Sequence, residues 1–150
     1  MDLHNDLKEL LRLLKSTGVD FLVVGAFAVA FYGRPRLTGD VDLFIRPSRN
    51  NVDLLQVALR EFSSDGIHFD PNSLATAGRM LRIGREPYRV DIMTSISGVE
   101  FEEAWADRVQ GNLGELTVDF ISIDHLLQNK RSTGRLKDVA DVDELTRDSE

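Results

Sequence analysis

Hydrophobic residues along the chain follow two spacings, which predict alternating helices and strands. Near the start, leucines recur every three or four residues, as on one face of a helix, so we predict a helix over residues 2–16. Short apolar runs next to glycine or proline, such as DFLVVG and DVDLFI, are typical of buried strands. Further helices are predicted over residues 26–33, 49–62, 100–108, 123–131 and 135–146, and strands over 20–25, 40–45, 79–84, 88–94 and 114–121.

Residues that stop or cap helices lie between these segments. Gly18 and Gly134 are predicted to end helices, and Ser48 and Ser122 to cap the helices that follow them. Residues 63–78 show no regular pattern and are interpreted as irregular. The order of elements predicts an α/β (α+β) fold, in which helices pack on a mixed β-sheet. The length of 150 residues predicts a single domain, 1–150.

The composition excludes several kinds of chemistry. The chain has no cysteine, which rules out disulfides, thiol nucleophiles and cysteine metal sites. With 42% hydrophobic and 29% charged residues, it has the composition of a soluble globular protein. The sequence lacks a signal-peptide pattern at its start, and no apolar run is long enough to span a membrane. We therefore expect a cytoplasmic protein that does not bind a membrane.

The charge is acidic overall but unevenly distributed. A net charge of −7 disfavours a protein that coats nucleic acid. Basic residues nevertheless gather in three groups, and such local groups suit a small polyanion such as a triphosphate. The alternative is that these side chains are simply solvated. The groups are Arg34, Arg36, Arg46 and Arg49; Arg79, Arg82, Arg85 and Arg89; and Lys130, Arg131, Arg135 and Lys137.

Two aspartates interrupt the apolar run DVDLFI. Residues two apart in a strand point to the same face, so Asp40 and Asp42 are predicted to project together and to repel each other. A divalent cation removes that penalty, and aspartate oxygens with room for water and phosphate suit Mg²⁺. Asp91 in the strand YRVDIMT adds a third carboxylate if the strands are neighbours, and such a cluster is able to hold two metal ions. The alternative is that these are edge-strand or turn aspartates paired with nearby arginines.

The segment VVGAFAVAFYG, which precedes the acidic pair, is predicted to be a strand, a glycine and a helix. Glycine allows the backbone to approach a ligand closely, and a helix start offers free amides to phosphate. A phosphate-binding helix start followed by paired carboxylates predicts a combined site for a nucleotide and its metal ion.

The stretch FLVVGAFAVAFYGRPRLTGDVDLFI resembles the nucleotidyltransferase superfamily that includes DNA polymerase beta. The signature of that superfamily is a glycine followed by Gly or Ser at a helix start, and then Asp-x-Asp or Asp-x-Glu on the next strand. Gly25 and Ala26 stand at the first element, Asp40 and Asp42 at the second, and Asp91 matches the third carboxylate. GRPRLTGDVDLFI and the tail DHLLQNKRSTGRLKDVADVDEL are similar to the small bacterial stand-alone members.

The resemblance implies an enzyme that uses Mg²⁺ or Mn²⁺ and transfers a nucleoside monophosphate from a nucleoside triphosphate, such as ATP, to a hydroxyl acceptor. It implies that Asp40 and Asp42 bind the metal ions, that Asp91 binds the ion on the acceptor side, and that Gly25 and the amide of Ala26 hold the phosphates. The acceptor is not readable from the sequence, and the resemblance leaves RNA, protein and a small molecule open. Similar small members include toxins of toxin–antitoxin pairs, which implies a candidate antitoxin partner.

The same resemblance places positive charge from Lys130, Arg135 and Lys137 near the phosphates. From the residues alone, the basic side chains of this tail are equally consistent with a solvated surface, and Asp138 is equally consistent with an ion pair to Arg135 across one helical turn.

One departure from the signature keeps other functions open. Ala26 stands where a second Gly or Ser is usual, so a hydroxyl contact to phosphate is missing while the backbone amide remains. The main alternative is a catalytically inactive nucleotide- or partner-binding module that keeps the fold. Another Mg²⁺ enzyme, such as a nuclease, is a third interpretation, although it has no need of the glycine and helix element.

Overall fold

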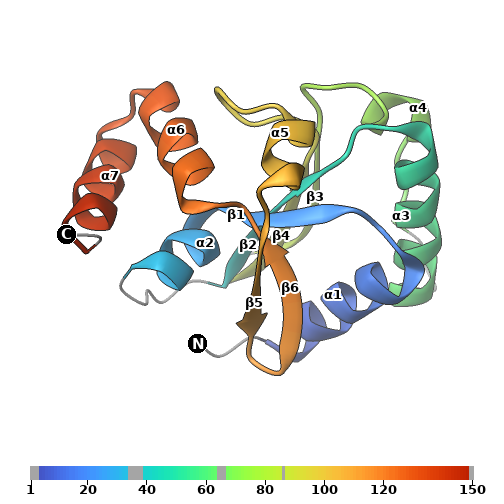
Figure 1. Ribbon diagram of the computed structural model, residues 1–150. Helices are drawn as coiled ribbons and strands as arrows, with labels where there is room; N and C mark the ends of the chain where they lie inside the picture. Colours follow the sequence, from blue (N-terminus) through green and yellow to red (C-terminus); the bar gives the residue numbers. More distant parts are fainter. Residues whose placement is uncertain (1–3, 34–38, 64–66, 86, 149–150) are drawn as a thin grey trace.

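The computed structural model describes residues 4–33, 39–63, 67–85 and 87–148. Most of the predicted loop over 34–39, including Arg34 and Arg36, lies outside the described residues; only Gly39 is described. Residues 2 and 3 of the first predicted helix also lie outside them. The elements, shown in Figure 1, are α1 (Asn5–Thr17), β1 (Phe21–Val24), α2 (Gly25–Tyr32), β2 (Asp40–Ile45), α3 (Arg49–Phe62), α4 (Pro71–Leu74), β3 (Met80–Arg85), β4 (Tyr88–Met93), α5 (Phe101–Ala106), β5 (Val109–Leu113), β6 (Leu116–Phe120), α6 (Ile123–Thr133) and α7 (Leu136–Asp148).

The described strands form a six-stranded sheet in the order β3-β4-β2-β1-β6-β5. β2 is parallel to β4 and β1 is parallel to β6, whereas β1–β2, β3–β4 and β5–β6 are antiparallel pairs. In Figure 1, α1 and α3 lie on one side of the sheet, and α2, α6 and α7 lie on the other. The prediction of a mixed sheet with helices packed on it is therefore confirmed.

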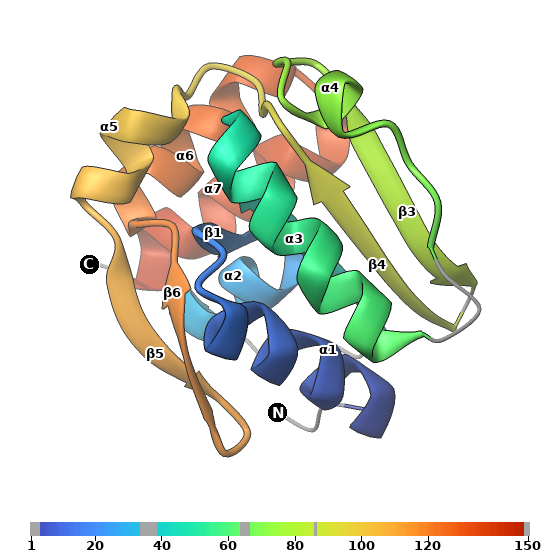
Figure 2. The same cartoon turned by 90° about the vertical axis from the view of Figure 1, so that its right-hand side faces the viewer.

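Aliphatic side chains fill the space between the sheet and the helices α1 and α3, which lie next to each other in Figure 2. Val41, Leu43 and Ile45 of β2 are buried there, because alternate residues of a strand point to the same side. The helices bury a matching stripe, made of Leu7, Leu10, Leu11 and Leu14 in α1 and of Val52, Leu55, Ala58 and Leu59 in α3.

None of the described helices has the combination of length and apolar character that a membrane crossing requires.

Two elements do not follow from the sequence pattern. α4 lies within residues 63–78, which were expected to be irregular; the side chain of Asp70 caps it by accepting a hydrogen bond from Asn72 N at 3.0 Å. A single turn is too short to show helical spacing, so no periodic signal marks it. β5 was also missed, because it is an edge strand with the largely polar sequence VQGNL and has only one buried side chain, Leu113.

The predicted helix caps and stops are confirmed. Ser48 Oγ accepts a hydrogen bond from Asn51 N at 3.2 Å, and Ser122 Oγ accepts one from His125 N at 3.2 Å. Gly18 and Gly134 end α1 and α6 in the left-handed conformation, with φ of 90° and 69°. Side chains other than glycine are strained there, which explains why these positions end helices.

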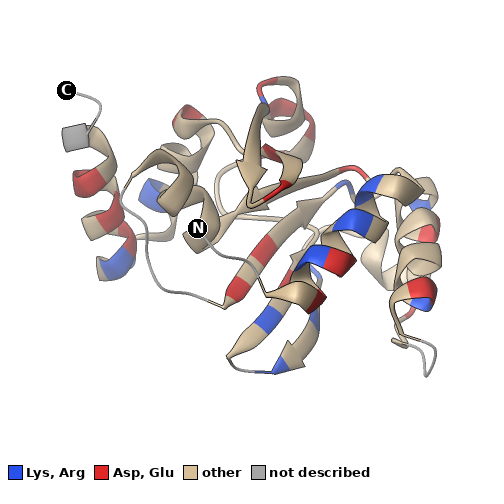
Figure 3. Ribbon diagram, turned by 90° about the horizontal axis from the view of Figure 1, so that it is seen from below, with Lys and Arg blue, Asp and Glu red and all other residues tan. Residues whose placement is uncertain are grey.

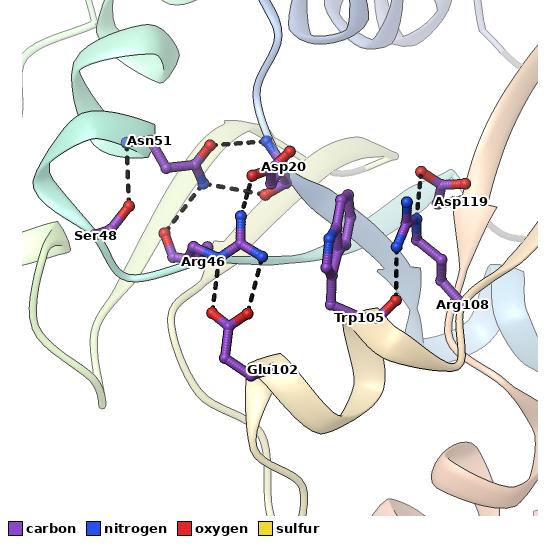
Figure 4. A network of polar contacts seen from close by, with 8 residues as sticks. All are labelled: Asp20, Arg46, Ser48, Asn51, Glu102, Trp105, Arg108 and Asp119. Atoms are coloured by element: carbon purple, nitrogen blue, oxygen red, sulfur yellow. Dashed lines mark hydrogen bonds and ion pairs between the residues drawn. The ribbon is translucent and has the colours of Figure 1, made fainter.

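A polar network fastens the start of β1 to the end of β2 (Figure 4). Arg46 forms a bidentate pair with Glu102 of α5, at 2.7 and 2.9 Å, and also pairs with Asp20. The buried side chain of Asn51 accepts from Asp20 N at 2.7 Å and donates to the carbonyl oxygens of Asp20 at 3.1 Å and Arg46 at 3.0 Å. One asparagine thus bonds three backbone groups of the two residues that precede β1 and follow β2.

We expect Asn51→Ala to lower the free energy of unfolding by about 2 kcal/mol, because Asp20 N loses its partner and the carbonyl oxygens of Asp20 and Arg46 each lose one of their two hydrogen bonds. Urea unfolding followed by circular dichroism measures the change. The matched control is Asn50→Ala, at the exposed neighbouring position of the same helix, which should cost less than about 0.5 kcal/mol. Equal losses in the two variants would contradict a special role of Asn51.

Candidate active site

The pairing of β2 with β4 brings the three predicted carboxylates together. In this parallel register Asp42 lies beside Asp91, and Asp40 lies beside Arg89. Asp40 and Asp42 are two residues apart, so they share the face of the sheet opposite the buried Val41 and Leu43. Figure 3 shows acidic and basic positions side by side on neighbouring strands of the sheet.

β2 lies between β1 and β4, so the alternative that its aspartates belong to an edge strand is wrong. The other half of that alternative, pairing with arginine, is confirmed for two of the three carboxylates. Arg89 Nη2 lies 3.3 Å from Asp40 Oδ2, and Arg82 Nε lies 2.9 Å from Asp91 Oδ1. In the part of the chain that the structure describes, Asp42 makes no ion pair.

Asp42 is the carboxylate with the most unfavourable surroundings. Burial raises its pKa, and the negative charges of Asp91 and Asp40 raise it further. Lys130 and Arg89 act in the opposite direction without cancelling the rise. Asp42 is therefore the side chain that gains most from an added cation.

Gly25 is required at the start of α2 by its contact with Asp42. Its φ of 66° is left-handed, and a Cβ at this position would lie 2.0 Å from Asp42 Oδ2. The residue before it, Val24, caps α2 without a side-chain hydrogen bond, so no side chain there occupies the amides of the first turn. Gly25 thus allows the start of a helix to lie directly against a carboxylate. From the sequence, glycine was expected here only because it gives the backbone freedom to approach a ligand; the structure adds that a side chain would collide with Asp42.

A cleft of about 630 Å³ collects most of the predicted site residues. Seven of them line it: Gly25, Ala26, Asp40, Asp42, Lys130, Arg135 and Lys137. Asp91 does not line the cleft; its side chain is only 10% exposed and lies beside Asp42 in the sheet. The carboxylates and the start of α2 therefore share one cavity with the basic residues of α6 and α7.

Sequence reasoning missed several polar residues of the cleft. Ser95 and Ser97, which follow the end of β4, were not assigned to the site, and Arg89 was placed only in a general basic group. Asn129 and Thr133 flank Lys130 on α6 and also line the cleft. Their spacing of four residues puts them on one helix face, and this signal was available in the sequence.

Lys130 is nearly buried and joins α6 to α7. Its Nζ lies 2.9 Å from Asp138 Oδ1 and 3.5 Å from Asp141 Oδ2. Asp138 also pairs with Arg135 Nε at 2.7 Å, so the predicted ion pair across one helical turn is confirmed. Burial alone would raise the pKa of Asp138, but hydrogen bonds from Thr133, Lys130 and Arg135 outweigh it and lower that pKa to about 2. The ammonium that borders the cleft is thus paired with a carboxylate, Asp138, whose low pKa keeps it ionised.

The carboxylates, the helix start and the basic residues make a site that suits a phosphate ester together with a cation. Two of the cleft carboxylates, Asp40 and Asp42, are spaced to share an ion, and Mg²⁺ is commonly held by one or two carboxylates plus substrate phosphates. Within the described residues, no three acidic or histidine side chains are arranged to hold a metal ion by themselves. The ligation of metal by Asp40, Asp42 and Asp91 stays a prediction.

Comparison with known proteins bears on this arrangement. Residues 3–149 match a family described as "Nucleotidyl transferase of unknown function (DUF2204)". The crystal structure of a "putative nucleotidyltransferase" from Thermotoga maritima is similar, with a TM-score of 0.58, 14% identity, and coverage of 97% of this chain and 96% of that chain. At that identity the likeness shows the fold alone. The search of curated proteins found no match.

We expect Gly25→Ala to destabilise the protein by about 1–3 kcal/mol more than Gly134→Ala, as measured by urea unfolding. Both glycines are left-handed, but a Cβ at Gly134 would meet no atom within 4 Å, so only Gly25→Ala adds a clash. Asp42→Ala in the Gly25→Ala background should recover part of the loss. Equal losses for the two glycines would show that the contact with Asp42 is unimportant.

Lowering the pH should remove the stabilising contribution of Asp138. A carboxyl whose pKa falls from 3.8 to about 2 on folding stabilises the protein above its unfolded-state pKa, and the stabilisation is lost as the pH falls through the folded-state value. The shift corresponds to about 2 kcal/mol. The unfolding free energies of wild type and Asp138→Asn should therefore differ at pH 6 and converge toward pH 2.

Urea unfolding at a series of pH values measures this convergence. Asp143→Asn, at an exposed position of the same helix, is the control and should differ little from wild type at every pH. A gap between wild type and Asp138→Asn that stays constant from pH 6 to pH 2.5 would contradict the assignment.

Proposed function

Since the chain belongs to DUF2204, a family of nucleotidyl transferases of unknown function, we propose that it transfers a nucleoside monophosphate from a nucleoside triphosphate to a hydroxyl acceptor. One observation carries the proposal: a single cleft is lined by the start of α2, by Asp40 and Asp42, and by basic residues of α6 and α7. Anionic phosphates suit the helix start and the basic residues, and a divalent ion suits the carboxylates. No other arrangement described in this chain offers both.

In this proposal the triphosphate lies between α2 and the α6–α7 junction. The backbone amides of Gly25 and Ala26 hold phosphate oxygens, and Lys130, Arg135 and Lys137 offset their charge. Ala26 has no hydroxyl to add a further hydrogen bond, a loss of about 0.5–1.5 kcal/mol. That is small beside the charge-assisted contacts, so we infer that triphosphate binding is retained.

Asp40 and Asp42 would hold Mg²⁺ or Mn²⁺ together with the phosphates. The fit rests on their shared face, on their exposure to the cleft, and on Asp42, which lacks an ion pair within the described residues. When bound, such an ion would supply Lewis-acid stabilisation of the negative charge on the phosphates.

The transfer forms one bond and breaks one. The acceptor hydroxyl oxygen attacks the α-phosphorus, and the bond from that phosphorus to the oxygen bridging the β-phosphate breaks, so pyrophosphate leaves with the electron pair. The hydroxyl proton passes to a carboxylate, and Asp91 is our candidate because it lies beside Asp42 without lining the triphosphate cleft. Lys130, Arg135 and Lys137 offset the charge of the departing pyrophosphate.

We further propose that the chain is a small stand-alone member of the superfamily that includes DNA polymerase beta. This rests on Gly25 before the helix and on the Asp40–Asp42 pair in the following strand. The proposed acceptors are RNA, protein or a small molecule, and the proposal includes a role in a toxin–antitoxin pair. The net charge of −7 disfavours a large RNA.

Incubation of the protein with each α-³²P-labelled nucleoside triphosphate, Mg²⁺ and a cell lysate tests the function. We expect label to pass to one fraction (RNA, protein or small molecules) and pyrophosphate to be released in equal amount. The control is Asp40→Asn/Asp42→Asn, which should transfer less than about 1% of the wild-type label, because several kcal/mol of charge stabilisation is lost.

Calorimetric titration with ATP, GTP, CTP and UTP separates the enzyme from the binding-module alternative. Triphosphate binding that needs Mg²⁺, without transfer to any fraction, would favour the catalytically inactive module. Equal affinity for adenosine and ATP would contradict the phosphate site itself.

A further inference from the structure

A row of charged side chains crosses three neighbouring strands at the site. Arg82 of β3 lies opposite Asp91 of β4 in the antiparallel pair, and Asp91 lies beside Asp42 of β2 in the parallel pair. On the far side of Asp42, β1 ends at Val24, the residue before Gly25. The backbone register therefore sets an arginine, and not a fourth carboxylate or an apolar residue, next to Asp91.

The side chains of Arg82 and Asp91 are in direct contact. Arg82 donates to both oxygens of Asp91, from Nε to Oδ1 at 2.9 Å and from Nη2 to Oδ2 at 3.4 Å. Such a two-point pairing matches the planar guanidinium to the carboxylate and fixes its orientation. The Asp91 side chain is 10% exposed, whereas that of Arg82 is 49% exposed, so the arginine covers a nearly buried carboxylate.

Arg89 adds a second guanidinium to the same group. Arg89 lies between Asp91 and Asp40: its Nε is 3.6 Å from Asp91 Oδ1, and its Nη2 is 3.3 Å from Asp40 Oδ2. Two guanidiniums thus form ion pairs with two of the three carboxylates, whereas Asp42 makes no ion pair within the described residues. A second divalent ion at Asp91 would have to displace a bidentate arginine from a nearly buried partner, which is costly.

We propose that Arg82 serves Asp91 as a built-in cation, so that this site takes one divalent ion, at Asp40 and Asp42, instead of two. The inference rests on the proposed function, because it concerns the ion that accompanies the triphosphate. Arg82 is then a positioning residue: its two hydrogen bonds hold the Asp91 carboxylate in one orientation without a metal ion. Asp91 stays available as a proton acceptor outside the set of metal ligands.

The number of Mn²⁺ ions bound per chain tests the proposal. Electron paramagnetic resonance of free Mn²⁺ counts the bound ions in the presence of one equivalent of α,β-methylene ATP, which cannot undergo the transfer. We expect one ion for wild type and one for Asp91→Asn, because Asp91 is not a ligand. We expect two for Arg82→Gln, because the third carboxylate is then open to an ion.

Two further variants are matched to Arg82→Gln. Arg82→Lys keeps the positive charge and should bind one ion. Arg85→Gln makes the same chemical change three residues along β3, on the opposite face of the strand, and should also bind one. Two ions in wild type, with one lost in Asp91→Asn, would overturn the proposal, and so would one ion in Arg82→Gln.

Failure of the proposed function gives a different result. In that case wild type binds no Mn²⁺ in the nucleotide complex, or Asp40→Asn/Asp42→Asn binds as many ions as wild type. A count of two ions in wild type that falls in this double variant overturns the built-in cation and leaves the proposed function intact.

Discussion

The parallel pairing of β2 with β4 determines which charged side chains meet at the site. It sets Asp42 beside Asp91 in the interior of the sheet, where two carboxylates are costly unless cations face them. The neighbouring elements lower this cost with basic side chains, or leave room for the carboxylates. β3 and β4 supply arginines, α6 supplies Lys130, and α2 begins with a glycine because a side chain there would collide with Asp42.

The ion pairs of the α6–α7 junction have a different consequence from those in the sheet. Lys130 is held by Asp138 and Asp141, so its side chain is ordered before any anion enters the cleft. Ordering a long basic side chain in advance lowers the entropy lost on binding. Arg135 is 70% exposed and Lys137 is exposed, so these two retain more freedom to adapt to a ligand.

Family membership and structural likeness carry different weight for function. The match to DUF2204 covers nearly the whole chain and supports nucleotidyl transfer as the general activity. The likeness to the Thermotoga maritima protein supports the arrangement of the strands and helices, since 14% identity does not carry an activity. Neither comparison names an acceptor for the proposed transfer.

Local elements and short-range chemistry could be predicted from the order of residues alone. Leucine spacing predicts α1, the serines predict the caps of α3 and α6, and Asp40 and Asp42 share a face because they stand two residues apart in a strand. The contacts between elements follow from the three-dimensional fold. Strand order and register place Arg82 on Asp91 and close Gly25 against Asp42, and they make the polar segment VQGNL an edge strand. The pairing of β2 with β4 joins segments that are far apart in the chain, whereas β3–β4 and β5–β6 are hairpins. Hydrophobic spacing indicates which face of a strand is buried, but it does not say which strand becomes the neighbour, and the register of a hairpin also depends on its turn.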